Sequence, residues 1–325
     1  MTYQASTGEL LPDSAATPAR AEERSAIIDL DAIRHNVRHL AAVASPAQVM
    51  AVVKADAYGH GAVQVARAAL GAGASWLGVA HISEALEYQD QGLLRVVGIF
   101  SHLSVADEPE RPETDEQLAA FRQVLAVAHD AGVDPEVRHL ANTPATLSRP
   151  DTHFDLVRVG LGLYGLSPFE GQSPAELGLR PAMTVRTVVS HCKDVPAGQG
   201  VSYGLNYRTD GVSTLGLIPL GYADGVPRIA TGGPVRVEGV NYPVVGRIAM
   251  DQMVIDLGPR HVAAGGPSIL GAEAVLFGDG ADGGPTADDW ARAAGTNNYE
   301  IVTRISPRVP RRYLHEEPSA GEERP

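Results

Sequence analysis

Hydrophobic residues in the first half of the chain form short runs that alternate with helical stretches. Residues 49–53 are an unbroken apolar run, typical of a strand buried on both faces of a parallel sheet. The run ends at Lys54, and a polar turn with Gly59 and Gly61 precedes apolar residues at helical spacing. Similar strand candidates are 26–30, 76–80, 95–100, 136–140 and 154–159. This alternation predicts a βα repeat with a parallel sheet.

The pattern changes after the Pro- and Gly-rich stretch 167–181, which we interpret as a domain boundary. Short β-type runs follow at 183–192, 214–220, 234–240, 242–245, 253–257 and 273–277. One helix is predicted at 286–294, and 298–305 resembles a closing strand. We therefore predict four segments: a disordered leader (1–24), a βα domain (25–175), a mostly antiparallel β domain (176–314) and a frayed tail (315–325).

Composition narrows the function classes. The 325 residues are 44% hydrophobic, which is ample for a sizeable core, and the net charge of −13 argues against nucleic acid or an anionic membrane as partner. The one cysteine, Cys192, excludes an internal disulfide framework and fits a reducing compartment. No run of about 18 apolar residues occurs, and the N-terminus lacks the pattern of a signal peptide. We expect a cytoplasmic protein that binds no metal ion.

Lys54 is the first candidate for chemistry, because it stands at the carboxyl end of a predicted buried strand. α/β barrels place their catalytic residues at that end of their strands. An amine there suits Schiff-base chemistry with a carbonyl or with pyridoxal phosphate. The alternative on position alone is a lysine that merely extends to solvent.

Five segments taken together resemble the alanine racemase family. They are VVKADAYGHG (52–61), HLANTPATL (139–147), VRVGLGLYG (157–165), VSYGLNY (201–207), and GYADG (221–225) followed by VGRIAMDQ (245–252). The resemblance implies a pyridoxal 5'-phosphate enzyme with a TIM-barrel-like α/β domain and a C-terminal β domain. It also implies a homodimer with shared active sites and a small amino acid as substrate.

The same resemblance implies roles for particular residues. Lys54 and Tyr203 match the two catalytic bases, with Lys54 also holding the cofactor as a Schiff base. Arg158 matches the arginine that faces the pyridine nitrogen, and His102 the histidine that orients it. The cofactor-phosphate contacts are matched by Tyr58, Thr143, Gly160, Leu161 and Tyr222, and the substrate contacts by Met250 and Asp251. In the family the partner chain supplies the tyrosine base and the methionine.

One departure from the family is large. An apparent internal deletion between residues 88 and 95 leaves room for one crossover helix, where relatives carry about three further βα units. An arginine that bonds the cofactor's phenolic oxygen, and the lysine that supports it, have no match here. The leading hypothesis is an alanine racemase that supplies D-alanine for peptidoglycan by a two-base mechanism. The alternatives are a racemase of another small amino acid, such as serine, and a catalytically impaired cofactor-binding remnant.

Overall fold

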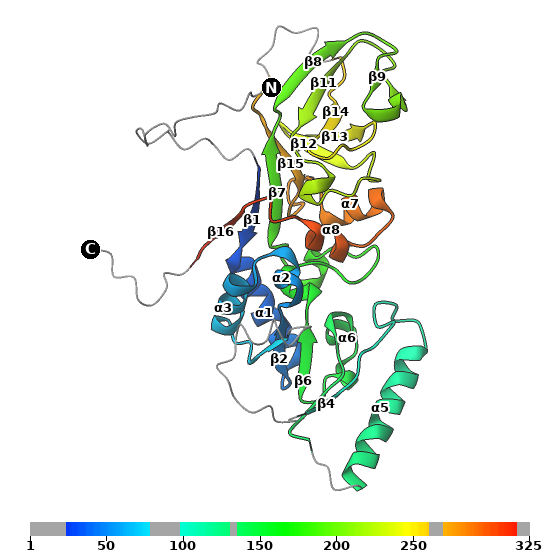
Figure 1. Ribbon diagram of the computed structural model, residues 1–325. Coiled ribbons are helices and arrows are strands. Elements are labelled where there is room, and N and C mark those ends of the chain that lie inside the picture. Colours follow the sequence, from blue (N-terminus) through cyan, green and yellow to red (C-terminus); the bar gives the residue numbers. More distant parts are fainter. Residues whose placement is uncertain (1–23, 79–97, 131–134, 260–268, 317–325) are drawn as a thin grey trace, which may run out of the picture.

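The computed structural model describes residues 24–78, 98–130, 135–259 and 269–316. The molecule is elongated, with helices and parallel strands at one end and a large β-sheet at the other (Figure 1). This mixed α/β architecture confirms the predicted fold class, a parallel βα domain followed by a mostly antiparallel β domain. The deletion point, the expected leader up to residue 23 and most of the expected tail lie outside the described residues.

Five parallel strands form the curved wall of the first domain. They are β2 (Gln48–Val52), β3 (Trp76–Gly78), β4 (Gly98–Phe100), β5 (Val137–His139) and β6 (Leu156–Val159). Strand β2 pairs with β3 and β6, and β4 pairs with β5. Backbone hydrogen bonds from Asp155 to Arg138 (3.1 Å) and from Arg158 to Ala141 (2.9 Å) join β6 to β5. The order is therefore β3-β2-β6-β5-β4, with β3 and β4 at the two ends of the described wall.

Helices of this domain cover the wall unevenly. They are α1 (Leu30–Ala44), α2 (Lys54–Gly59), α3 (Ala62–Gly71), α5 (Glu113–Asp130) and α6 (Thr143–Ser148), with short 3-10 turns η1 (Pro150–Thr152) and η2 (Leu161–Tyr164). Helix α1 buries the stripe Ile33, Val37 and Leu40 completely. Helix α5 buries only Thr114, Leu118 and Phe121, and extends away from the body of the molecule (Figure 1).

The second domain is built on a nine-stranded sheet of order β16-β1-β7-β15-β12-β13-β14-β11-β8. Its strands are β1 (Arg24–Asp29), β7 (Met183–Val188), β8 (His191–Val195), β11 (Ser213–Ile218), β12 (Pro234–Val237), β13 (Val240–Val245), β14 (Met253–Asp256), β15 (Glu273–Phe277) and β16 (Arg311–Leu314). All pairs are antiparallel except β1 with β16. A small ribbon of β9 (Gly200–Val201) and β10 (Tyr207–Arg208) and the 3-10 turns η4 (Tyr203–Leu205) and η5 (Tyr222–Asp224) complete it. The turn η3 (Ala175–Leu177) contacts His39 on α1 of the first domain.

Two sequence-based expectations need correction. The run 26–30 was expected to open the βα domain, but β1 pairs with β7 and β16 of the large sheet. Residues 298–305 were predicted as a strand, and this is wrong: they form helix α8 (Asn298–Arg304), which follows α7 (Ala287–Ala294). The side chain of Asn297 caps α8 by accepting the Glu300 N–H, so the segment starts as a helix and turns its apolar residues inward.

Candidate active site

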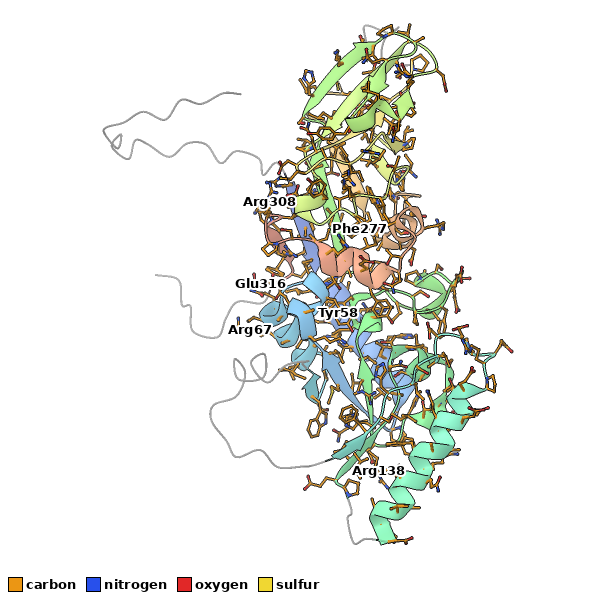
Figure 2. All side chains as sticks on the ribbon, turned by 45° about the vertical axis from the view of Figure 1, so that its right-hand side comes forward. Tyr58, Arg67, Arg138, Phe277, Arg308 and Glu316 are labelled. Atoms are coloured by element: carbon orange, nitrogen blue, oxygen red, sulfur yellow. The ribbon has the colours of Figure 1, made fainter. Side chains whose placement is uncertain are left out.

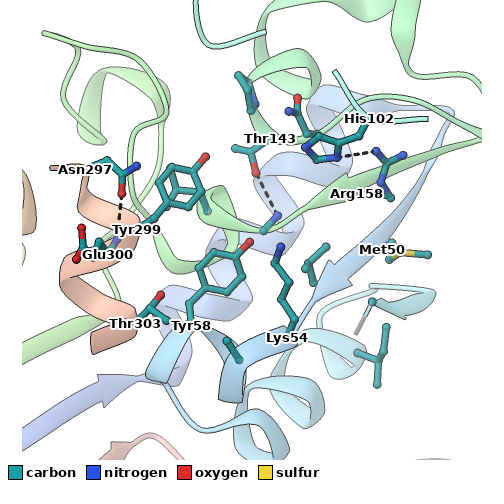
Figure 3. A pocket seen from close by; sticks show the side chains of 18 of the residues that line it. Met50, Lys54, Tyr58, His102, Thr143, Arg158, Asn297, Tyr299, Glu300 and Thr303 are labelled. Carbon is teal, nitrogen blue, oxygen red and sulfur yellow. Dashed lines mark hydrogen bonds between the residues drawn. The ribbon is translucent and has the colours of Figure 1, made fainter. Parts of the chain in front are cut away.

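A cavity of about 920 Å³ opens at the carboxyl ends of β2 and β6 and faces helix α8 (Figure 3). Polar strand ends meet there because parallel strands present their carboxyl ends at one rim. Seven of the residues expected at the site line this cavity: Lys54, Tyr58, His102, Thr143, Arg158, Gly160 and Leu161. They come from segments up to about a hundred residues apart in the chain.

Lys54 enters the cavity from a left-handed turn. The four residues 55–58 that follow it, none of them glycine, have φ angles of 53°, 51°, 52° and 55°. Each such residue costs roughly 1 kcal/mol, so the turn has to be held from outside. Arg311 on β16 donates from Nε to the Gly59 carbonyl at 3.0 Å, and Asp56 accepts the Ala62 N–H at 2.8 Å. The Lys54 Nζ then lies 6.0 Å from the centre of the Tyr58 ring.

Beside Lys54, hydroxyl and N–H groups converge on one corner of the cavity. The Thr143 hydroxyl oxygen accepts the N–H groups of Gly160 (3.1 Å) and Gly162 (3.3 Å). A Cβ at Gly160 would lie 2.6 Å from the Tyr58 hydroxyl, so only glycine allows this approach. Burial raises the pKa of Tyr58 to about 12, which keeps its O–H as a donor. Among the described residues the Leu161 N–H has no acceptor, so the corner retains free donors for an anion.

Arg158 occupies the opposite side, on strand β6. Its guanidinium donates to the carbonyls of Ser101 (2.7 Å), His139 (3.0 Å) and Leu140 (3.1 Å). Burial lowers the pKa of Arg158 to about 10, which leaves it cationic at neutral pH. Carbonyl dipoles, in place of a carboxylate, thus fix the position of a full positive charge.

Two imidazoles flank this guanidinium. The Nδ1 atoms of His102 and His139 each lie 3.3 Å from a nitrogen of Arg158 (Figure 3 draws the His102 contact). Burial, and then the charges of Arg158 and Lys54, lower the pKa of His102. Burial, and then Arg158, lower the pKa of His139 to about 4. Both rings are therefore neutral near pH 7 and can accept hydrogen bonds from Arg158.

Sequence reasoning missed the residues that helix α8 and its cap bring to the cavity: Asn297, Tyr299, Glu300, Thr303 and Arg304. Burial raises the pKa of Tyr299, whose ring centre lies 6.2 Å from that of Tyr58. A helical interpretation would have found them, because Asn297 with Glu300 is a capping pattern and positions 299 and 303 share a helix face.

The expected site residues of the β domain do not line the cavity. Tyr203, Met250 and Asp251 are exposed, with 70% of Tyr203 and 53% of Met250 accessible. Tyr222, expected at the cofactor phosphate, also lies outside the cavity and is 37% accessible, whereas Tyr299 is the second tyrosine that lines it. Among the described residues the Met250 N–H has no acceptor, so it can serve a ligand.

A second, partly open cavity of about 230 Å³ adjoins this site, and Met50, Phe100 and His139 line both. Residues of all five described strands line it: Met50, Trp76, Gly98, Phe100, Val137, His139 and Leu156. The interior of an eight-stranded barrel is filled by layers of such side chains. Among the described residues, the space between the five strands therefore stays partly unfilled beside the first cavity.

Both domains match models of known families. Residues 182–313 match the alanine racemase C-terminal domain. The alanine racemase N-terminal domain matches in two pieces, 28–94 and 87–168. The break between the pieces falls at the apparent deletion inferred from the sequence.

Individual relatives agree. An alanine racemase of Streptomyces coelicolor is 44% identical, over 92% of this chain and 96% of the relative, and one of Mycolicibacterium smegmatis is 39% identical, over 91% and 96%. A solved alanine racemase from Streptomyces coelicolor A3(2) superposes with a TM-score of 0.85 at 45% identity, covering 90% of this chain and 98% of that one. The first alignment extends over 387 residues although this chain has 325, so that relative carries a segment with no counterpart here.

Proposed function

The chain belongs to the alanine racemase family and is an enzyme of that family, and we propose that it interconverts L-alanine and D-alanine with pyridoxal 5'-phosphate as cofactor. The observation that carries the proposal is the cavity that combines the Lys54 amine, a corner of phosphate-type donors and the buried cation Arg158. Each of these groups matches one functional part of pyridoxal phosphate: its aldehyde, its phosphate and its ring nitrogen.

The residues present fit this cofactor by their own chemistry. The cavity lining carries a net positive charge, which suits a phosphate: Lys54, Arg158 and Arg304 are cationic and Glu300 is anionic. Tyr58, Thr143 and the free Leu161 N–H would hold the phosphate, and Tyr299 lies within reach of the same corner. Arg158 would face the ring nitrogen, with His102 and His139 fixing its orientation. Lys54 would attach to the aldehyde.

When bound, pyridoxal phosphate withdraws electrons from the amino acid and makes its α-proton acidic. Racemisation then requires one base on each face of the Cα atom. We assign the Lys54 amine to one face. Tyr203 is assigned to the other face, as a phenol that delivers or takes the proton there. The Met250 N–H would receive the substrate carboxylate.

We assign the second face to another copy of the chain; the exposure of Tyr203 and Met250 outside the cavity of their own chain supports this. A homodimer of two-fold symmetry would complete two equivalent sites at once. Exposed Tyr203, Leu205, Ile229 and Met250 give the β domain apolar surface for such a contact.

We further propose that the protein works in the cytoplasm and supplies D-alanine for peptidoglycan. In the described residues no helix combines the length and apolar character needed to cross a membrane.

The test is direct. The purified protein is incubated with pyridoxal phosphate and D-alanine, and L-alanine is counted, with serine in a parallel assay. Borohydride reduction followed by peptide mapping should place the cofactor on Lys54. Formation of L-alanine with labelling of Lys54 is the expected result.

Three other outcomes contradict parts of the proposal. No cofactor on Lys54 removes the pyridoxal assignment. Labelling without turnover of any amino acid would identify an impaired cofactor-binding protein. Turnover of serine but not alanine would correct the substrate.

A further inference from the structure

The loop that carries Met250 is held by a cluster of charges outside the cavity. Asp224, in turn η5, is fully buried, and its Oδ1 has no hydrogen bond in the described structure. That oxygen lies 3.3 Å from Nη1 of Arg24 and 3.6 Å from Nε of Arg308. Arg308 also donates to the Asp251 carboxylate at 2.6 Å. One guanidinium therefore links a buried carboxylate to the residue that follows Met250.

Backbone contacts tie the same two segments together. The N–H groups of Tyr222 and Ala223 donate to the carbonyls of Ala249 (3.0 Å) and Met250 (2.9 Å). A Cβ at Gly221 would overlap both of these carbonyl oxygens, so glycine is needed for the turn to lie against the loop. Asp224 itself accepts the Gly221 N–H at 3.0 Å, and its carbonyl accepts the Ser306 N–H.

These contacts use the Met250 carbonyl and leave its N–H available to a ligand. The Met250 carbonyl is bound by turn η5, whereas the Met250 N–H has no acceptor in the described residues. The Asp251 carboxylate is bound by Arg308, so it serves as an anchor for the loop. Figure 2 places Arg308 on the β-domain side of the molecule, away from Tyr58 and the cofactor cavity.

We infer that Arg308 is a positioning residue: by joining Asp224 to Asp251 it sets the direction of the Met250 N–H, and with it the affinity for the substrate carboxylate. This inference rests on the proposed function, in which the Met250 N–H receives that carboxylate in a second copy of the chain. A hydrogen bond is strongly directional, so a displaced donor loses most of its contribution to binding. The effect should fall on KM, because Arg308 lies outside the cavity where the cofactor would bind.

Arg308→Met removes the charge but keeps an unbranched side chain, and Arg308→Lys keeps the charge. In the holoenzyme we expect Arg308→Met to raise KM for alanine about tenfold, the value of one hydrogen bond, with kcat within about threefold. Arg308→Lys should recover part of the loss. The matched control is Arg292→Met, because Arg292 is 75% exposed and pairs only with Asp289 among the interactions described.

Hydrogen exchange gives a readout that does not depend on activity. The peptide 247–253 should exchange faster in Arg308→Met than in wild type, and should be unchanged in Arg292→Met. Asp251→Asn should show the same acceleration, and serves if Arg308→Met does not fold. Unchanged exchange in these variants, or a fall in kcat at constant KM, would overturn the inference. A wild-type protein that turns over no amino acid would instead refute the proposed function and leave the exchange comparison to decide the role of Arg308.

Discussion

The two domains differ in how completely their sheets are built. The β domain carries a continuous sheet of nine strands, whose central residues Val235, Val244 and Ile255 are almost inaccessible. The described wall of the βα domain has five parallel strands, and an aromatic side chain near its end, Phe100, is 63% exposed. The N-terminal family model matches the first domain in two pieces, and the alignment with a relative is longer than this chain. We attribute the difference between the two sheets to the segment missing from the first domain.

The incomplete domain nevertheless carries the cofactor half of the site. Lys54 follows strand β2, Arg158 lies on strand β6, and Gly160 follows β6. Strands β2 and β6 pair with each other inside the wall. The strands next to the missing units are β3 and β4. A loss at the edge of a sheet leaves the register of its inner strands intact. The comparison therefore predicts that loss of Tyr203, which lies outside the cavity, spares cofactor binding, whereas turnover needs residues of both domains.

Lys54→Ala should have the largest effect and remove both properties. Without the amine the cofactor has no covalent attachment and one face has no base, so turnover should fall roughly ten-thousand-fold or more. The visible absorption of the bound cofactor should vanish as well, as measured by spectroscopy after gel filtration. Lys193→Ala is the matched control, because Lys193 is the only other lysine in the chain and lies exposed on β8. Full absorption in Lys54→Ala would show that Lys54 is not the residue that binds the cofactor.

Tyr203→Phe should separate the two domains. Removal of the phenolic O–H takes away one base, and general acid–base catalysis is worth about 10²–10⁴-fold in rate. Because Tyr203 does not line the cavity, cofactor absorption should stay at the wild-type level. Turnover assays and spectra on the same preparation test this. Loss of absorption together with activity would show that the β-domain tyrosine also holds the cofactor.

His60 should make the turn after Lys54 sensitive to acid. It is fully buried, its Nδ1 lies 3.0 Å from the carbonyls of Ala57 and Tyr58, and its Nε2 has no partner in the described structure. Burial lowers its pKa from 6.5 to about 4. The unfolded chain therefore binds more protons between these values. Stability is at its full value above pH 6.5 and falls as the pH drops toward 4, by up to about 3 kcal/mol.

Urea unfolding at pH 7.5 and 5 measures this loss. His60→Gln should reduce the difference in the free energy of unfolding between pH 7.5 and pH 5, whatever it does to the stability at pH 7.5. His191→Gln, at an exposed histidine on β8, should leave the dependence as in wild type. An equal loss of unfolding free energy in wild type and His60→Gln would show that His60 does not cause the sensitivity to acid.

The smallest effect is expected on helix α5. Val124 and Val127 are 52% and 63% exposed, so Val124→Ser and Val127→Ser should each change the free energy of unfolding by less than about 0.5 kcal/mol. Phe121→Ala, at a buried position on the same helix, should cost about 3 kcal/mol. If the valine changes lowered the melting temperature strongly or altered the oligomeric state, a partner surface would cover this helix.

Sequence reasoning found the inner strands and Lys54 because continuous apolar runs and the change of period at 167–181 are local signals. It could not assign β1 to the large sheet, since pairing with β7 and β16 is decided by contacts some 150 residues and more away in the chain. Helix α8 was missed because Ile301 and Val302 read as strand residues, and with it Tyr299 was lost from the site. The left-handed turn 55–58 has no glycine to announce it and depends on Arg311 from the far end of the chain.

In the proposed enzyme each active site joins the βα domain of one chain to the β domain of another. Mixing Lys54→Ala with Tyr203→Phe subunits, each inactive alone, under conditions that exchange subunits tests it. A mixed dimer then has one site with both substitutions and one with neither, and at equal amounts the mixture should regain about a quarter of the wild-type activity. No recovery, in a mixture shown to contain mixed dimers, would contradict the claim and place both bases in a single chain.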